Sequence, residues 1–396
     1  MAHRSLRVAL YSHDTVGLGH VRRNLLIADT LRRHDPAIRT LMLTGAHHTG
    51  VLPRDVSHDC VALPALTKRG RRVRSRSGTP LPSLLDVRAQ TIRAALRSFA
   101  PDLLIVDKVP RGVGGELELA LGDIRARGGR CVLGLRDILD DPIVVQREWR
   151  EAGNETAIRD YYDAVWVYGD RQVVDVARDY RLADATAAKI RYTGYLDRRV
   201  RDGEALDDAR ACFEQHAPKG KFVLCTLGGG EDGLRLAESF CRIRLPRDTG
   251  GVMLTGPFMP ADARARLRGL LANRPEIRMI DFVREPGELM RRADRVICMG
   301  GYNTFCEILA YEKRALVVPR VLPRTEQWIR AQRFEELGQL AVCHPGDLSP
   351  RALESWLEQD VPRASRDRID LHGLARIPEL AAELARDVDS AATHAA

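Results

Sequence analysis

The sequence predicts an α/β protein built from two doubly wound domains, each a parallel sheet with helices on both faces. Short, nearly continuous apolar runs, which are typical of strands buried on both sides, alternate along the chain with amphipathic helical stretches. This alternation gives way to a polar, charged stretch at residues 197–221 and then begins again. The length of 396 residues also favours two domains over one.

The first predicted domain covers residues 1–195 and contains five expected strands. They are the apolar runs 6–12, 40–45, 102–107, 130–135 and 164–169. Helical stretches such as 20–34 and 84–99 lie between several of these runs. A parallel sheet needs a crossover of this kind between successive strands, and an α-helix is its usual form.

The second predicted domain covers residues 196–396 and is joined to the first near residues 196–220. Its expected strands are 221–227, 251–256, 277–283, 295–301 and 315–319. Residues 377–396 are expected to form one amphipathic helix with a frayed tail. Ligands of such sheets bind beyond the carboxyl ends of the strands. Two such domains facing across a cleft would therefore carry their chemistry on the loops that follow strands.

The bulk composition excludes several classes of protein. No apolar run is long enough to span a bilayer, and the first residues do not read as a signal peptide, so we expect a cytoplasmic protein. The eight cysteines are scattered and form no C-x-x-C pair. A zinc site or a disulfide framework is therefore not expected.

The net charge of +8 raises the question of an anionic partner. Arginine is mixed with acidic residues along most of the chain, and the one basic concentration is "TKRGRRVRSRSG" at residues 67–78. We expect a flexible solvated loop there. It lacks the interleaved aromatics that stack bases, which argues against nucleic acid. Apolar residues follow it, so peripheral contact with the inner face of an anionic membrane, or with an acidic acceptor, stays open.

The first strand is followed by a glycine loop, "SHDTVGLGHVRRNLL". A dinucleotide fingerprint would need a third glycine where Arg22 stands, and the next strand ends without an acid for a ribose hydroxyl, which argues against NAD. What remains is a tight turn through Gly17 and Gly19 that lets a ligand approach a helix N-terminus. His20 would point into the cleft, or would serve only as a helix cap.

A second glycine turn, "TLGGGEDG", follows the strand at 221–227. Three glycines give this turn backbone freedom and exposed N–H groups, which an anionic or sugar group needs at close range; they are Gly228, Gly229 and Gly230. The turn lacks the Lys-Ser/Thr end of a Walker A loop, so nucleotide hydrolysis of that type is not expected.

The stretch "CMGGYNTFCEIL" places a third glycine turn, Gly300 and Gly301, between a strand and a helix. Three residues open that helix: Tyr302, Asn303 and Thr304. The N–H groups of a helix start carry partial positive charge and suit a diphosphate without help from Lys or Arg. Glu307 lies about one turn further on, where it could accept hydrogen bonds from a pair of sugar hydroxyls or be a solvated helix acid.

Two further loops complete the candidate ligand site. Glu326 and Gln327 stand at a helix start after the strand at 315–319 and offer hydrogen bonds to a sugar. Phe282 and Val283 end the strand at 277–283 and could hold a flat base through apolar contact and backbone groups.

The stretch from 281 to 332, with "ADRVICMGGYNTFCEILAYEKRALVVPRVLPRTEQWIRA", follows the pattern A-D…G-G/A-x-T-x-x-E…P…Q-x-x-N-A, and residues 6–30 carry a weaker likeness. Together they resemble the GT-B glycosyltransferases, which have two Rossmann-like domains, and most closely the MurG-type N-acetylglucosaminyltransferases and the related diacylglycerol glucosyltransferases. "YSHDTVGLGHVRRNL", "LGLRDILDDP" and "IRYTGYLDRR" are typical of a bacterial group described as predicted glycosyltransferases.

The resemblance implies an acceptor-side domain at 1–195 and a nucleotide-sugar donor domain at 196–396 that includes the terminal helix. It implies roles for particular residues: Glu307 for the ribose hydroxyls, Gly300–Thr304 for the diphosphate, Gly228–Gly230 lining the donor site, Phe282 and Val283 for the base, and Gln327 for the donor sugar. Gly19 and Glu326 join this expected donor set, and His20 matches the histidine that ends the family's first glycine loop. The chain departs from MurG in having fewer glycines in that loop and Arg330 in place of Asn.

The expected reaction is inverting transfer of a sugar from a nucleotide sugar, expected to be UDP-linked, to an acceptor hydroxyl. His20 is the candidate base because its pKa lies near neutrality, and an acid would orient it. Asp107 is favoured for that part over Asp137; both follow strands of the first domain. Helix N-terminal amides, not a metal, would stabilise the leaving diphosphate, and the D-x-D at Asp387–Asp389 is interpreted as accidental. No cofactor is expected beyond the nucleotide-sugar co-substrate.

The acceptor could be a small molecule, a glycan or a lipid-linked group. Water as acceptor would make the protein a nucleotide-sugar hydrolase, in which Asn303 could take part, and a UDP-sugar 2-epimerase is a further alternative on the same fold. A non-catalytic protein that binds a nucleotide sugar is the alternative from another class.

Overall fold

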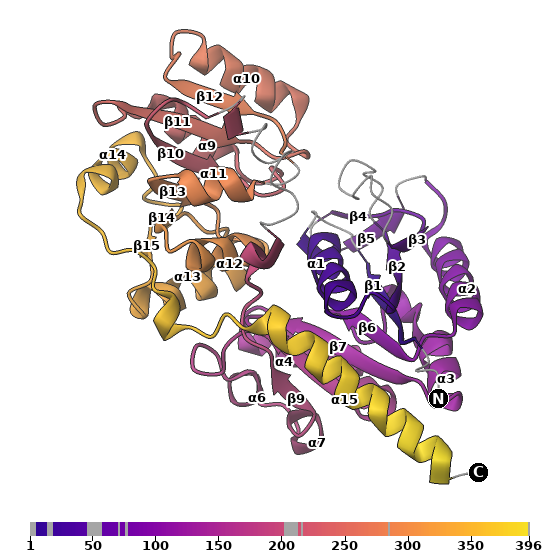
Figure 1. Cartoon of the computed structure of the whole chain (residues 1–396). Helices are drawn as coiled ribbons and strands as arrows, with labels where there is room; N and C mark the ends of the chain where they lie inside the picture. Colours follow the sequence, from indigo (N-terminus) through magenta and orange to yellow (C-terminus); the bar gives the residue numbers. More distant parts are fainter. Residues whose placement is uncertain are drawn as a thin grey trace. The chain divides into compact units, whose positions relative to one another are not determined.

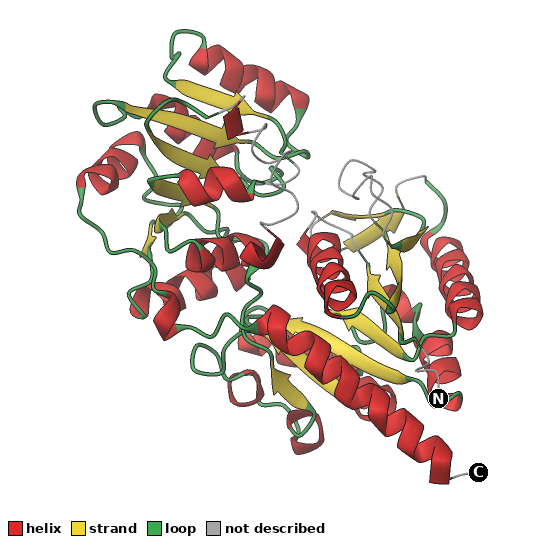
Figure 2. Ribbon diagram, in the orientation of Figure 1, coloured by secondary structure: helices red, strands yellow, loops and turns green. Residues whose placement is uncertain are grey.

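The computed structural model describes residues 5–13, 19–45, 58–69, 72–75, 78–201, 213–214, 217–283 and 286–394. The chain divides into two compact units. Unit 1 comprises residues 1–196 and 372–396, and unit 2 comprises residues 197–371. Each unit contains a parallel sheet flanked by helices (Figures 1 and 2). The predicted fold class, α/β with two Rossmann-like domains, is confirmed.

The sheet of unit 1 has seven parallel strands in the order β3-β2-β1-β6-β7-β8-β9. The strands are β1 (Arg7–Ser12), β2 (Arg39–Thr44), β3 (Asp59–Ala62), β6 (Leu103–Asp107), β7 (Arg130–Arg136), β8 (Ala164–Tyr168) and β9 (Ile190–Tyr192). All five predicted strands are present. The two edge strands β3 and β9 were not predicted, because they are short and mostly exposed or half-buried, and so carry no apolar run.

The helices of unit 1 connect these strands, except for α15, which enters the unit at the end of the chain. They are α1 (Gly19–His34), α2 (Leu81–Phe99), α3 (Glu118–Ala126), α4 (Pro142–Glu151), α5 (Asn154–Tyr161), α6 (Val176–Asp179), α7 (Asp184–Ala187) and α15 (Gly373–His394), with a short 3-10 turn η1 (Val113–Gly115). The chain runs from β1 through α1 to β2 on one side and later enters β6 on the other side of β1. The direction of strand addition therefore reverses between β1 and β6.

The terminal helix α15 differs from the prediction that placed it with the second domain. It contacts α1, β6 and β7, and Figure 1 shows it running along the strands of unit 1. Its first turns bury Leu374, Ile377 and Ala381, and Arg376 Nη1 donates to the carbonyl oxygen of Thr193 at 2.8 Å. Its amphipathic pattern shows that one face is buried, but the pattern does not say against which sheet.

The basic segment at 67–78 also differs from the prediction of a flexible loop. Its backbone forms an antiparallel hairpin of β4 (Leu66–Arg69) and β5 (Arg72–Ser75), in which Thr67 pairs with Arg74. The β-branched side chains of Thr67 and Val73 favour strands, and Leu66 is buried beneath the hairpin. Residues 70–71 and 76–77 lie outside the described part of the chain.

The sheet of unit 2 has six parallel strands in the order β12-β11-β10-β13-β14-β15. The strands are β10 (Lys221–Thr226), β11 (Thr249–Leu254), β12 (Ile277–Ile280), β13 (Arg295–Cys298), β14 (Arg314–Val317) and β15 (Ala341–Val342). The five predicted strands are again present, and the two-residue edge strand β15 is additional. Here the direction of strand addition reverses between β10 and β13.

The helices of unit 2 alternate with these strands. They are α9 (Leu234–Arg242), α10 (Ala261–Leu271), α11 (Gly287–Arg292), α12 (Tyr302–Ala310), α13 (Glu326–Glu336) and α14 (Pro350–Glu358), with 3-10 turns η2 (Arg198–Arg201) and η3 (Arg366–Arg368). Among the described residues, no helix combines the length and the apolar character that crossing a bilayer would require.

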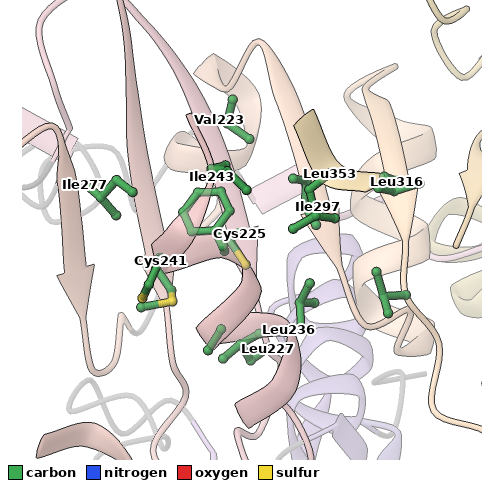
Figure 3. Packing of buried hydrophobic residues seen from close by; sticks show 14 of the residues in the cluster. Val223, Cys225, Leu227, Leu236, Cys241, Ile243, Ile277, Ile297, Leu316 and Leu353 are labelled. Carbon is green, nitrogen blue, oxygen red and sulfur yellow. The ribbon is translucent and has the colours of Figure 1, made fainter. Parts of the chain in front are cut away.

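One hydrophobic cluster fills the space between the unit 2 sheet and helices α9 and α14 (Figure 3). Strand residues such as Cys225 and Ile297 meet Leu236 of α9 and Leu353 of α14. Burial raises the pKa of the Cys241 thiol to about 11, so this cysteine behaves as a small apolar side chain. The cysteines of the described residues are free thiols.

Candidate functional site

Each of the two parallel sheets has one place where the order of its strands reverses, and most of the predicted site residues follow the strands at those places. In unit 1 these strands are β1 and β6, which lead to His20 and end at Asp107. In unit 2 they are β10 and β13, which lead to Gly228–Gly230 and to Gly300–Glu307. In open α/β sheets this reversal creates the crevice in which ligands bind.

His20 and Asp107 form a contact in unit 1. His20 is the second residue of α1, and its Nδ1 contacts Oδ2 of Asp107, which is 1% exposed at the end of β6. Burial alone would raise the pKa of Asp107, but the Arg23 guanidinium and His20 outweigh burial and hold that pKa well below its usual range. An ionised carboxylate can only accept hydrogen bonds. Nδ1 of a neutral His20 therefore carries the proton, and the ring lone pair is at Nε2.

Asp137, the alternative orienting acid, accepts a hydrogen bond from Tyr195 Oη at 2.9 Å. It is buried after β7, one strand further from β1 than Asp107 is. The two acids thus have different neighbours, and His20 pairs with Asp107.

Arg23 belongs to the same cluster, and the sequence analysis did not single it out. Its Nη2 lies 2.5 Å and its Nε 3.2 Å from Oδ1 of Asp107, and Nη2 lies 3.1 Å from His20 Nδ1. The guanidinium carbon lies 5.7 Å from the centre of the Tyr168 ring on β8. The i,i+3 spacing from His20, which puts both side chains on one helix face, was the signal in the sequence.

Four influences act on the pKa of His20. Burial lowers it, the contact with Asp107 raises it, and the nearby cations Arg23 and Arg136 lower it; the net direction is downward. The lowered pKa keeps His20 neutral at physiological pH, which is the form that can accept a proton. The His13 ring, just after β1, lies 5.0 Å from the His20 ring between centroids. Residues 14–18, including Gly17 of the predicted loop, lie outside the described part of the chain.

The third glycine turn presents the N-terminus of α12 to open space. Gly300 has φ +80°, and a Cβ there would lie 2.6 Å from Val317 Cγ1, so the position requires glycine. Gly301 is the N-cap, and a Cβ built on it meets nothing within 4 Å. As a glycine, Gly301 supplies no capping side chain. The first N–H groups of a helix have no acceptor within the helix, and a ligand oxygen could serve as one.

The residues that open α12 have different environments. Tyr302 is buried, with the Arg330 guanidinium 5.7 Å from its ring centre, whereas Asn303 and Thr304 are half-buried. Arg330, which stands where MurG-type proteins have Asn, is fully buried and also lies 5.8 Å from the Phe305 ring centre. The Tyr302 ring is therefore part of the packing beneath the turn.

Glu307 is not the solvated helix acid that was the alternative interpretation. Its side chain is 8% exposed, and Oε1 lies 3.0 Å from Nη1 of Arg198, whose own side chain is 11% exposed. Arg198 belongs to η2, in the stretch that the sequence analysis treated only as a polar connection. A buried acid needs such a partner, but the sequence does not indicate which arginine provides it.

The second glycine turn combines a fixed end and an open end. Gly230 has φ +93°, and a Cβ there would lie 2.3 Å from the carbonyl oxygen of Thr255. The Phe258 N–H donates to the carbonyl oxygen of Gly229 at 2.9 Å. Gly228 has φ +63°, and a Cβ on it would meet nothing within 4 Å. The turn is held against the loop after β11 while Gly228 faces open space.

Gln327 and Glu326 contact Arg320 in the loop after β14. Gln327 Oε1 accepts from the Arg320 backbone N–H at 3.0 Å, and Glu326 Oε1 lies 3.7 Å from Arg320 Nη2. Arg320 Nη1 also donates to Asp232 Oδ2 at 2.9 Å, which links this loop to the loop after β10. Phe282 and Val283 are half-buried after the edge strand β12, on the far side of β10 and β11 from β13.

The described residues contain no group of three or more His, Cys, Asp and Glu side chains that could hold a metal ion. Asp387–Asp389, the D-x-D sequence, falls within α15. This helix lies in unit 1, outside the loops that follow the strands at either reversal.

Comparison with known proteins links this geometry to glycosyltransferases. Residues 252–369 match the family model "Glycosyltransferase family 28 C-terminal domain", a stretch that includes α12, Glu307 and α13. The UDP-N-acetylglucosamine--N-acetylmuramyl-(pentapeptide) pyrophosphoryl-undecaprenol N-acetylglucosamine transferase of Haemophilus influenzae (strain PittGG) is 29% identical over 86 residues, which is 22% of this chain and only 24% of that enzyme. The Streptomyces avermitilis enzyme of the same name is 24% identical over 372 residues, 90% of each chain.

Solved structures extend the likeness over nearly the whole chain. Acinetobacter baumannii MurG has a TM-score of 0.57 at 14% identity, covering 96% of this chain and 99% of its own. The UDP-GlcNAc 2-epimerase of Methanocaldococcus jannaschii has a TM-score of 0.61 at 13% identity, covering 95% and 99%. The glycotransferase of kitacinnamycin has a TM-score of 0.56 at 16% identity, covering 98% and 99%. At these identities the structures show the fold alone, which is the fold predicted from the sequence.

Proposed function

We propose that this chain, which is a GT-B glycosyltransferase with a family 28 C-terminal domain and distant MurG-like relatives, transfers a sugar with inversion from a UDP-sugar to an acceptor hydroxyl. The observation that carries the proposal is the contact of His20 Nδ1 with the ionised Asp107, which leaves the Nε2 lone pair as a base. This contact lies where the strand order of unit 1 reverses.

The proposed chemistry is a single displacement. The acceptor hydroxyl gives its proton to His20 Nε2 while its oxygen forms a bond to the anomeric carbon. The bond from that carbon to the diphosphate oxygen breaks, and the bonding electrons leave with the nucleoside diphosphate. Asp107 stabilises the imidazolium that forms, and one displacement inverts the anomeric configuration.

Unit 2 is the proposed donor-binding part. The N–H groups of the first turn of α12 would hold the diphosphate in front of Gly301. Glu307 would accept hydrogen bonds from the ribose hydroxyls. The other proposed donor contacts within unit 2 come from Gly228–Gly230, Phe282, Val283, Glu326 and Gln327. Because peptide groups balance the leaving charge, we expect turnover to persist in EDTA. Loss of activity in EDTA with recovery on adding manganese would contradict this.

The hydroxyl that accepts the sugar is proposed to belong to a small molecule, a glycan or a lipid-linked group. A lipid-linked acceptor would agree with the undecaprenol-linked substrate in the names of the Haemophilus and Streptomyces relatives. We propose that the basic hairpin β4–β5 makes peripheral contact with an anionic membrane surface, as such an acceptor would require.

Product analysis separates the proposed transfer from the alternatives on the same fold. Incubation with UDP-, GDP- and dTDP-sugars gives a glycoside only when an acceptor is present, free sugar if water is the acceptor, and an epimeric nucleotide sugar for a 2-epimerase. Binding without any product would indicate a non-catalytic nucleotide-sugar-binding protein. The likeness to a 2-epimerase is one of fold alone at 13% identity.

The role of His20 is tested with His20→Ala. We expect kcat to fall by about 10²- to 10⁴-fold while donor affinity stays nearly unchanged, because the base acts in the chemical step. His34→Ala, which replaces an exposed histidine at the other end of α1, is the matched control. An unchanged kcat in His20→Ala would remove His20 from the mechanism.

A further inference from the structure

Arg23 lies between the two members of the proposed catalytic pair and contacts both. Its Nε and Nη2 both approach Oδ1 of Asp107, at 3.2 and 2.5 Å, which leaves Oδ2 for His20. Its Nη2 is also 3.1 Å from His20 Nδ1. The side chains of Arg23 and Asp107 are 2% and 1% exposed. The carboxylate is thus divided between two partners inside the protein.

We propose that Arg23 is a positioning residue that keeps Asp107 ionised and the His20 ring in its neutral, Nδ1-protonated form, and so fixes Nε2 as the proton-accepting atom. This inference rests on the proposed function, because it assumes that His20 is the base. It concerns how the base is kept available, and Arg23 itself touches no reacting atom.

The charges of the cluster support this role. The charges of Arg23 and Asp107 cancel. Protonation of His20 would therefore create a net positive charge among buried groups, which is unfavourable. Without Arg23, the same protonation would neutralise an isolated buried carboxylate and would be favoured. A histidine paired only with aspartate would therefore tend to be already protonated when substrate arrives.

Within the described part of the chain, three other charged or titratable groups lie around His20, and none of them replaces Arg23. Arg136, at the end of β7, also lowers the pKa of His20, although less than Arg23 does. Burial raises the pKa of Tyr168 on β8, so this ring stays neutral under the Arg23 guanidinium. His13 lies 5.0 Å away between ring centroids and faces His20 from the end of β1.

Two variants test the inference. Arg23→Met keeps much of the side-chain volume and removes the charge, whereas Arg23→Lys keeps the charge. The readouts are the NMR titration of the His20 ring, assigned with His20→Ala, and the pH dependence of kcat/KM. Arg32→Met, on the same helix but about two and a half turns away, is the control.

In Arg23→Met we expect the pKa of His20 to rise by about one unit or more, and the acidic limb of kcat/KM to move upward by the same amount. On that limb the loss is about tenfold per unit, and it is recovered at higher pH where His20 is neutral again. Arg23→Lys should titrate close to the natural protein. A purely structural role would instead lower activity equally at every pH.

An unchanged His20 titration in Arg23→Met would overturn the inference. If that variant does not fold, Arg23→Gln can replace it, because the amide still donates to Asp107 but carries no charge. The pKa of His20 should rise in this variant too, and an unchanged titration would again overturn the inference. The titration does not depend on turnover, so the two proposals can fail separately. A shifted titration in a protein that transfers no sugar would refute the proposed function alone, and an unshifted titration in an active enzyme would refute only the role of Arg23.

Discussion

Arg198 and Glu307 form an ion pair within unit 2, with Nη1 of Arg198 3.0 Å from Oε1 of Glu307. Glu307 lies in the middle of α12, and Arg198 reaches it from η2, 109 positions earlier in the chain. The carboxylate that we propose for the ribose hydroxyls is therefore held in one orientation before any donor binds.

Arg198→Met is expected to weaken UDP binding by a few-fold, because Glu307 loses the contact that orients it. In a Glu307→Gln background the same change should have little further effect, since both variants act through one carboxylate. Isothermal titration calorimetry with UDP on the four proteins of this cycle measures the coupling. Equal losses from Arg198→Met in both backgrounds would show that Arg198 does not act through Glu307.

Substitution of the two glycines before α12 is expected to affect different properties, stability at Gly300 and donor binding at Gly301. Gly300→Ala should destabilise the protein by about 1–3 kcal/mol, because φ is +80° and the new Cβ would clash with Val317. Gly301→Ala should fold normally, since a Cβ there meets nothing, but should raise KM for the donor by obstructing the helix N-terminus. Thermal denaturation and donor KM measure the two effects. A normal KM in Gly301→Ala would contradict diphosphate binding at this turn.

Asp107→Asn is expected to lower kcat by about 10²- to 10⁴-fold with little change in KM for the donor. A neutral amide can present its NH₂ group to Nδ1, which would leave the proton on Nε2, the atom that must accept one. Asp123→Asn is the matched control, because Asp123 pairs with Arg93 away from His20. Steady-state kinetics give kcat for both variants. A kcat of Asp107→Asn equal to that of Asp123→Asn would show that Asp107 takes no part in the reaction.

Stability is expected to fall on acidification, in part because of the catalytic pair. The pKa of His20 is lowered by folding, so the unfolded chain binds this proton more readily and protonation favours unfolding. Its stabilising contribution is present above the unfolded pKa of about 6.5 and is lost as pH falls through the folded value. Asp107, whose pKa is also lowered, adds a further loss below about pH 4.

Thermal denaturation against pH should therefore show a shallower decline in Tm for His20→Gln than for the natural protein between about pH 7 and pH 5. His34→Gln should follow the natural protein, because His34 is exposed. Parallel curves for all three proteins would mean that His20 is not held in the neutral form.

The basic hairpin β4–β5 predicts salt-sensitive binding to anionic vesicles. Each basic side chain near such a surface contributes about 1 kcal/mol, so Arg74→Glu should weaken association several-fold. Arg171→Glu, at an arginine that is 70% exposed elsewhere in unit 1, is the control. Cosedimentation at low and high salt measures the effect. No salt-sensitive association of the natural protein would end the membrane proposal.

The sequence predicts ten of the parallel strands because each lies in a largely apolar run, as in "LLIVD" of β6. It also predicts that the candidate residues lie on loops that follow strands, because glycines and polar residues interrupt the apolar pattern there. Which of these loops lie at the two reversals of strand order is seen only in the structure. It does not reveal the carboxylate partners of Arg23 and Arg198, which lie 84 and 109 positions away and meet the arginines only through the fold. In an arginine-rich chain, composition cannot separate these buried cations from solvated ones.

The two differences from the predicted fold, at α15 and at the β4–β5 hairpin, have a similar origin. The α15 pattern marks a buried face without naming the sheet beneath it, and the helix returns to unit 1 after the chain has completed unit 2. In the hairpin, the strand-favouring residues Thr67 and Val73 stand among basic residues, so the composition of the segment is that of a solvated loop.

The most direct test of the central claim, that a nucleotide diphosphate binds at the start of α12, is calorimetric titration of UDP in EDTA. We predict that the natural protein and His20→Ala bind UDP with equal affinity, and that the affinity of Glu307→Gln is lower by about tenfold or more. Undiminished binding by Glu307→Gln, or binding that requires a divalent cation, would contradict it.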